Sequence, residues 1–126
     1  MKVFESFVVA SLGFIIVTVL SDPQPNNESI AVPILYVYAV FFSPIFEEII
    51  CRKAIQDQLN KHIKTNSSIL ISGFIFATLH FNLSLFVGYF FIGLVWGYYY
   101  KKTGNIFVPI FSHFLFNYFA LLIQSF

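Results

Sequence analysis

Long apolar stretches separated by short polar segments dominate the pattern of this chain. Residues 21–29 form the clearest polar loop, in which two prolines and two asparagines break regular structure. The apolar runs cover residues 7–20, 30–46, 69–81, 83–100 and 106–123. Because each run offers several turns of apolar helix, the pattern predicts an all-α, polytopic membrane bundle of about five transmembrane helices.

The segment at residues 51–65 follows a different pattern, in which charged and apolar residues are mixed. Ile55, Leu59 and Ile63 recur at every fourth position, with charged residues between them. This spacing is typical of an amphipathic helix. We therefore predict one amphipathic helix that leaves the membrane along its surface.

Composition narrows the class of protein further. Of the 126 residues, 58% are hydrophobic and 10% are charged, and the mean hydropathy is +0.80. A soluble domain of this size could not bury so much apolar surface, so we predict an integral membrane protein in contact with the lipid bilayer. The net charge of +1 provides no basic face for phosphates, which argues against nucleic acid as a partner.

The charges in the loops predict how the chain is oriented. Lysine and arginine occur near the N-terminus, at residues 52–64 and at residues 101–102, whereas the loops near residues 22–28 and 82 have neither. With five spans this alternation places the N-terminus in the cytoplasm and the C-terminus outside. Trp96 and the tyrosines at residues 98–100 predict an aromatic belt at the membrane surface.

Four polar side chains interrupt the apolar runs at a similar depth. At a helical rise of about 1.5 Å per residue, His80, His113 and Asn117 lie about 20, 12 and 18 Å from one membrane edge. By the same measure Glu47 lies about 12 Å deep. Ionisable groups inside a bilayer are costly and indicate a functional site, so we expect these four side chains to converge.

Helical spacing suggests a role for each polar group. Glu48 and Arg52 are four residues apart, acid first, and can pair along one helix face, whereas Glu47 lies about 100° around the helix and faces elsewhere. A carboxylate and an imidazole from different helices can activate water. His113 and Asn117 share one face and can donate hydrogen bonds to an oxyanion. The residues therefore predict hydrolysis of an acyl bond inside the membrane.

Other interpretations of the same residues stay open. The Glu47–Glu48 pair alone is also typical of a solvated helix end, and His80 could be an interfacial residue. Asn117 could join two helices through a hydrogen bond. Glu47, His80 and His113 could also bind zinc, although the chain has no His-Glu-x-x-His motif. We predict no cofactor and keep zinc as the alternative.

Three short motifs follow one another along the chain, and they are Glu47-Glu48-x-x-x-Arg52, Phe76-x-x-x-His80 and His113-x-x-x-Asn117. Together they resemble the motifs of the CAAX prenyl protease and bacteriocin-processing family, also called Abi proteins. These are bacterial relatives of the Rce1-type prenyl-protein endopeptidases. The resemblance covers residues 36–122 and implies an all-helical intramembrane glutamate protease.

The resemblance also implies a role for each motif residue. Glu47 and His80 would activate the attacking water, and the last motif would form the oxyanion site. The candidate catalytic residues are thus Glu47, His80, His113 and Asn117, and the supporting residues are Glu48, Arg52 and Phe76. The expected division of the chain is an N-terminal transmembrane helix with its polar loop at residues 1–29 and the CAAX-protease-like core at residues 30–126.

These observations together predict an intramembrane endopeptidase that cleaves a membrane-associated or secreted peptide precursor. A composition rich in Phe, Ile, Lys and Asn and poor in Arg indicates AT-rich codons and a bacterial source. The alternative function is a bacteriocin self-immunity protein that binds without proteolysis. Because only one helix precedes the core, we expect a second copy of the chain or a partner membrane protein to complete the substrate cavity.

Overall fold

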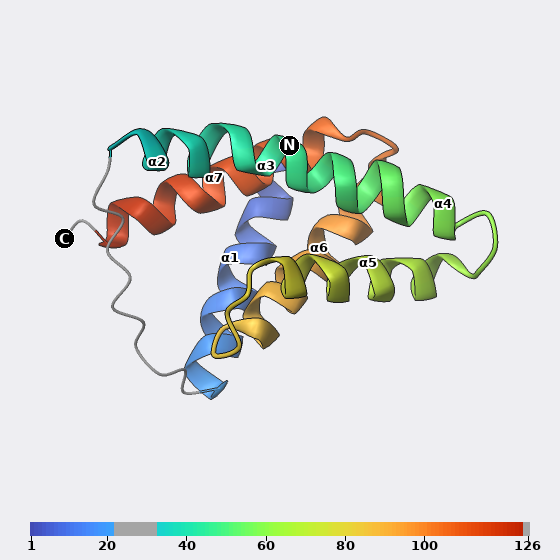
Figure 1. Cartoon of the computed structure of the whole chain (residues 1–126), viewed down its shortest axis with the longest axis horizontal. Helices are drawn as coiled ribbons and strands as arrows, with labels where there is room; N and C mark the ends of the chain where they lie inside the picture. The colour runs from blue at the N-terminus through green and yellow to red at the C-terminus, as the bar shows by residue number, and fades with distance from the viewer. Residues whose placement is uncertain (22–32, 125–126) are drawn as a thin grey trace.

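The computed structural model describes residues 1–21 and 33–124, and within these residues it contains helices and no strand. The predicted all-α bundle is therefore confirmed. The helices are α1 (Lys2–Ser21), α2 (Pro33–Val37), α3 (Ser43–Glu48), α4 (Asp57–Leu59), α5 (Thr65–Leu79), α6 (Phe86–Thr103) and α7 (Phe107–Gln124) (Figure 1). Two π-helical segments, η1 (Tyr38–Phe42) and η2 (Ile49–Gln56), join α2, α3 and α4 into one long helix.

The long helix continues through Pro44 because its backbone changes to π-helical bonding just before the proline. In η1 the N–H of Ser43 bonds to the carbonyl of Tyr38. The next bond in this pattern would join residue 44 to the carbonyl of Ala39, but proline has no N–H. That carbonyl instead accepts a hydrogen bond of 2.9 Å from Nδ2 of Asn117 on α7. The carbonyl that the proline leaves without a partner in its own helix thus joins the long helix to α7.

The amphipathic segment predicted at residues 51–65 is not a separate surface helix. Its first half continues the long helix through η2 and α4, and the chain then turns into α5. Arg52 and Gln56 are fully buried, because this face of the long helix packs against α5 and α6. The apolar stripe is the more exposed one, and Ile63 is 37% exposed. The prediction failed because polar side chains with buried partners, rather than apolar ones, face the interior.

Helices α5 and α6 approach each other closely at two glycines. A Cβ atom on Gly93 would lie 3.0 Å from the Cα of Gly73. One turn further along α6, a Cβ on Gly97 would lie 3.0 Å from Oε1 of Gln56 and 3.2 Å from Nη1 of Arg52. The small residues at this spacing therefore let α6 pack against α5 and against the polar face of the long helix.

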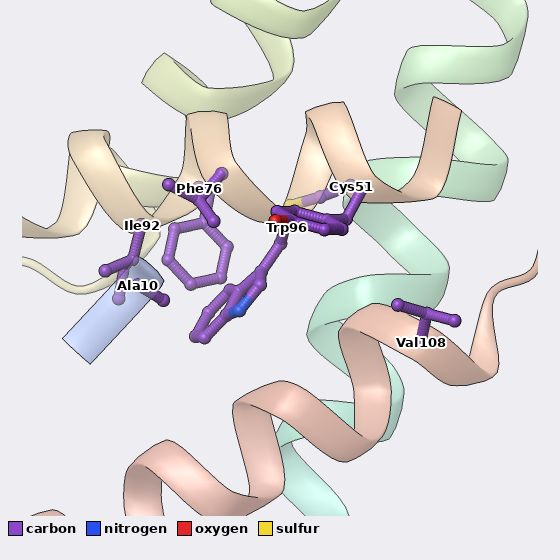
Figure 2. Close-up of a cluster of buried hydrophobic side chains, with 8 residues drawn as sticks. Ala10, Cys51, Phe76, Ile92, Trp96 and Val108 are labelled. Atoms are coloured by element: carbon purple, nitrogen blue, oxygen red, sulfur yellow. The ribbon is translucent and has the colours of Figure 1, made fainter. Parts of the chain in front are cut away.

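The centre of the bundle is an apolar cluster to which α1, the long helix, α5, α6 and α7 contribute. Figure 2 shows Trp96 and Phe76 within it, and the cluster also contains Ala10, Cys51, Ile92, Val95, Tyr99 and Val108. The aromatic belt predicted around Trp96 is therefore wrong for most of its members, since Trp96 is fully buried and only Tyr98 is exposed, at 51%. The reason is that α6 packs against α1, α5 and α7, so that few of its faces are free.

The outer surface of the bundle is apolar. The helices at Lys2–Ser21 and Ile34–Leu59 are long and apolar enough to cross a membrane, and Thr65–Leu79 and Phe107–Ile123 are shorter apolar helices. Large side chains such as Val19, at 73% exposed, and Ile34, at 67%, face outward. Apolar exposure on this scale indicates a surface that contacts lipid.

The N-terminal helix belongs to the same bundle, because α1 packs against α6 and α7. Residues 22–29 of the predicted polar loop lie outside the described residues. The expected division at residue 29 stays a prediction.

The close approach of α5 and α6 can be tested by substitution. We expect Gly93→Val to destabilise the purified protein in detergent by about 1–3 kcal/mol, because the new side chain meets the backbone of Gly73. Val87→Leu, at a half-exposed position of the same helix, is the control and should change stability by less than about 0.5 kcal/mol. Equal melting temperatures for the two variants would contradict the close approach.

Candidate active site

The residues of the three sequence motifs meet in one place. Glu47 lies in the middle of the long helix, His80 follows the last residue of α5, and His113 lies in the first half of α7. Oε2 of Glu47 is 3.8 Å from Nε2 of His80 and 3.7 Å from Nε2 of His113. These groups, which we predicted to converge at one depth, are therefore neighbours in space.

The two oxygens of Glu47 have different surroundings. Oε1 accepts a hydrogen bond from Oγ of Ser43, one helical turn earlier. Oε2 is buried and has no hydrogen-bond partner among the described residues. Its distances to the two imidazoles exceed those of direct hydrogen bonds. Sequence reasoning missed Ser43, although a hydroxyl four residues before a glutamate on a helix is a recognisable signal.

The second glutamate of the pair belongs to a buried network of charges. Nε of Arg52 donates to Oε2 of Glu48 at 2.8 Å, and both side chains are fully buried. This confirms the predicted pairing. Oε1 of Glu48 lies 3.1 Å from Nδ1 of His113. Nη1 of Arg52 donates to Oγ of Ser72, which in turn donates to the carbonyl of Cys51. Burial of these charges is tolerated because each one has a partner.

Both histidines use Nδ1 for an anchoring bond and direct Nε2 at Glu47. Nδ1 of His80 lies 2.9 Å from the carbonyl of Phe76, and Nδ1 of His113 lies next to the carboxylate of Glu48. Since both partners are acceptors, Nδ1 carries the proton in the neutral imidazole and Nε2 is left as an acceptor. Two acceptor nitrogens thus face one carboxylate oxygen that has no hydrogen-bond partner among the described residues.

Aromatic rings enclose the two histidines. Phe76, predicted as a supporting residue, is fully buried, with its ring centre 4.7 Å from that of His80 and 5.6 Å from that of His113. Tyr89 and Trp96 of α6 each stack on one of the imidazoles. Sequence reasoning missed Tyr89 and misplaced Trp96, because in a chain with 21% aromatic residues no local signal distinguishes one ring from another.

A pocket of about 350 Å³ opens beside these residues. Its polar wall consists of Ser43, Glu47, His80 and Asn117, and its apolar wall consists of Phe14, Ala39, Leu85, Tyr89, Phe116, Ala120 and Leu121. His113 does not line the pocket and is only 2% exposed, so it lies behind Glu47 as seen from the opening. Asn117 makes the bond between helices that the sequence had left open as an alternative, and its amide keeps a second N–H.

Among the described residues, no group of three or more histidine, cysteine, aspartate or glutamate side chains is arranged to hold a metal ion. The zinc alternative built on Glu47, His80 and His113 stays a prediction, which the chelator experiment below tests.

Most of this chain is similar in sequence to known proteins. A family model described as "Type II CAAX prenyl endopeptidase Rce1-like" matches residues 29–119. The chain is 35% identical over 94 residues, 75% of its length, to "Putative membrane peptidase YdiL" of Bacillus subtilis (strain 168). It is 30% identical over 112 residues, 80% of its length, to "Membrane-embedded CAAX protease MroQ" of Staphylococcus aureus (strain USA300). These matches cover 38% and 45% of the two relatives. No solved structure matches the chain.

The buried charge network leads to a prediction on stability. Arg52→Met leaves the charge of Glu48 buried with His113 as its remaining partner, so we expect a loss of about 3–5 kcal/mol. Adding Glu48→Gln removes that charge, and the double variant should therefore melt at a higher temperature than Arg52→Met alone. Thermal unfolding in detergent measures both. A double variant that is no more stable than the single one would show that the pair does not compensate charge.

Proposed function

Since the chain belongs to the Rce1-like family of type II CAAX prenyl endopeptidases, we propose that it hydrolyses peptide bonds within the membrane. The observation that carries this proposal is the position of the Glu47 carboxylate between Nε2 of His80 and Nε2 of His113. This group of side chains adjoins a pocket large enough for a short stretch of peptide. Membrane location itself follows from the apolar helices and from the membrane peptidases that the chain resembles.

The proposed reaction begins with a water molecule held between Glu47 and His80. The water donates one hydrogen bond to Oε2 of Glu47 and one to Nε2 of His80, both of which are acceptors in the tautomer assigned above. Its oxygen attacks the carbonyl carbon of the substrate while Glu47 takes one proton. When the C–N bond breaks, Glu47 returns this proton to the leaving amine.

The oxyanion formed by this attack needs hydrogen-bond donors. Asn117 lines the pocket and has an N–H beyond the one that it gives to the carbonyl of Ala39, so we assign it as the donor that reaches the substrate. His113 does not line the pocket, so we assign it a place behind Glu47, with Nε2 toward Oε2 of Glu47 and Nδ1 bonded to Glu48. We assign the Glu48–Arg52 pair to the support of His113 rather than to contact with substrate, because both residues are fully buried.

The lining of the pocket also suggests which substrates the site accepts. Beyond its polar wall the lining is apolar, which favours apolar side chains next to the scissile bond. A membrane-associated or secreted peptide precursor meets this requirement, because it can approach the site from the lipid. Immunity by binding alone has no such support, since it would leave the arrangement around Glu47 without a role.

Substitution of the proposed catalytic groups tests the reaction. We expect Glu47→Gln and His80→Ala each to lower peptide hydrolysis at least about 100-fold, because each removes a group that activates water. The measurement is cleavage of membrane-associated apolar peptides by protein in liposomes. With water labelled with heavy oxygen, mass spectrometry should find the label in the new carboxyl group.

The control for this experiment is His62→Ala, because His62 is the third histidine of the chain and is exposed beyond the end of the long helix. It should retain wild-type activity. Wild-type rates in Glu47→Gln would refute the proposed role of Glu47, whereas no cleavage by the wild type itself would refute the proposed hydrolysis and favour a binding protein. Inhibition by a zinc chelator, reversed by added zinc, would instead support the metal alternative.

The proposed orientation has the N-terminus in the cytoplasm and the C-terminus outside. We expect a reporter enzyme that is active only outside the cytoplasm to be active when fused after residue 126. Fused after residue 62, close to the basic segment, it should be inactive. The opposite result at both positions would reverse the orientation, and equal activity at both would indicate an even number of spans between them.

A further inference from the structure

Helix α6 carries none of the motif residues, yet two of its side chains lie flat against the two motif histidines. The ring centres of Tyr89 and His80 are 4.0 Å apart, with an angle of 22° between the planes. Those of Trp96 and His113 are 4.1 Å apart, with an angle of 24°. Tyr89 and Trp96 are about two helical turns apart and therefore share one face of α6.

These two contacts differ from ordinary packing between aromatic rings. Aromatic pairs usually lie offset or edge to face, with centres about 4.5–7 Å apart. Phe76 meets the same two histidines in this way, tilted at 4.7 Å and edge-on at 5.6 Å. The two stacks from α6 are the closest ring pairs among the described residues. Face-on contact at this distance instead covers one face of each imidazole.

The backbone around His80 shows why its ring needs a contact from another helix. His80 follows the last residue of α5, and Phe81 takes a left-handed conformation with a φ of 49°. The α-helical backbone therefore does not continue past this histidine. The bond from Nδ1 to the carbonyl of Phe76 fixes one edge of the imidazole. Tyr89 covers a face of the same ring and so limits its rotation about that edge.

His113 has a corresponding arrangement in the interior. Its Nδ1 is held by Glu48, and Trp96 covers one of its faces. Nε1 of Trp96 donates a hydrogen bond of 2.9 Å to Oγ of Ser112, the residue before His113. The indole is thus fixed to the same turn of α7 that carries the imidazole.

We propose that Tyr89 and Trp96 are positioning residues that hold the planes of His80 and His113 so that both Nε2 atoms face Glu47. The inference rests on the proposed function, because the direction of an imidazole matters to turnover only if the imidazole takes part in it. The two residues differ in one respect. Tyr89 lines the pocket and Trp96 does not, so Trp96 acts only through His113.

The stacks can be observed without any enzyme assay. The chain has three histidines, so protein labelled at histidine gives one Hε1 signal for each of three imidazoles by NMR in detergent micelles. The signals are assigned with His62→Gln, His80→Gln and His113→Gln. We expect Tyr89→Leu to shift only the signal of His80, because it removes a shielding ring from one face. Tyr89→Phe should leave all three signals in place, and His62 serves as the internal reference.

Trp96 is tested by the same spectra and by kinetics. Because Trp96 is fully buried, Trp96→Phe is used beside Trp96→Leu to keep a ring in the core. Trp96→Leu should shift the signal of His113 and lower kcat about 3- to 30-fold with KM unchanged, because the imidazole loses the ring that holds its plane. Trp96→Phe should recover most of this rate. Tyr89→Leu should change kcat and KM together, because Tyr89 also lines the pocket.

The possible results distinguish a failure of the positioning role from a failure of the proposed function. Unchanged histidine signals in Tyr89→Leu and Trp96→Leu would overturn the stacks themselves. Shifted signals together with wild-type kcat in Trp96→Leu, while Glu47→Gln is inactive, would overturn only the positioning role. Equal peptide cleavage by wild type and Glu47→Gln would overturn the reaction proposed at Glu47, and the positioning role with it.

Discussion

The fold depends on two opposite charges that are completely removed from solvent. Arg52 and Glu48 lie on the same face of the long helix, and neither side chain has any exposed area. One pair on one helix does not satisfy five guanidinium N–H donors and two carboxylate oxygens. Nη1 of Arg52 finds Ser72 on α5 and Oε1 of Glu48 finds His113 on α7, whereas Nη2 of Arg52 has no hydrogen-bond partner among the described residues. Because uncompensated buried charge is strongly destabilising, these helices are held against the long helix at the place where the candidate active site forms.

The two adjacent glutamates have different environments because of their angular separation on the helix. Glu48 faces inward, where Arg52 and His113 neutralise its charge. Glu47 is turned about 100° away and reaches the pocket wall, where one oxygen is held by Ser43 and the other faces the two imidazoles. A pair of neighbouring carboxylates thus provides one group whose charge is paired and one whose Oε2 has no hydrogen-bond partner among the described residues. Both residues are glutamates, so the difference between them comes from their surroundings alone.

Much of this arrangement could be predicted from the sequence, and the remainder could not for identifiable reasons. The spacing of Glu48 and Arg52 determines a contact within one helix, and the depth of the histidines follows from a constant helical rise. Contacts between helices depend on how each helix is rotated, which the local pattern does not define. For this reason the stack of Trp96 on His113 and the bond from Arg52 to Ser72 were missed.

The same limitation explains the error at residues 51–65. An apolar stripe normally marks the inward face of a helix, but here the inward face carries Arg52 and Gln56, and each has a buried partner on another helix. Gly97 makes this possible, since its missing side chain leaves space for both polar groups and its carbonyl accepts a hydrogen bond from Gln56. In a bundle whose outer surface contacts lipid, apolar residues are suited to either face, and the polar residues therefore carry more information about which face is buried. Periodicity of the polar positions is thus the better guide to helix orientation in such a chain.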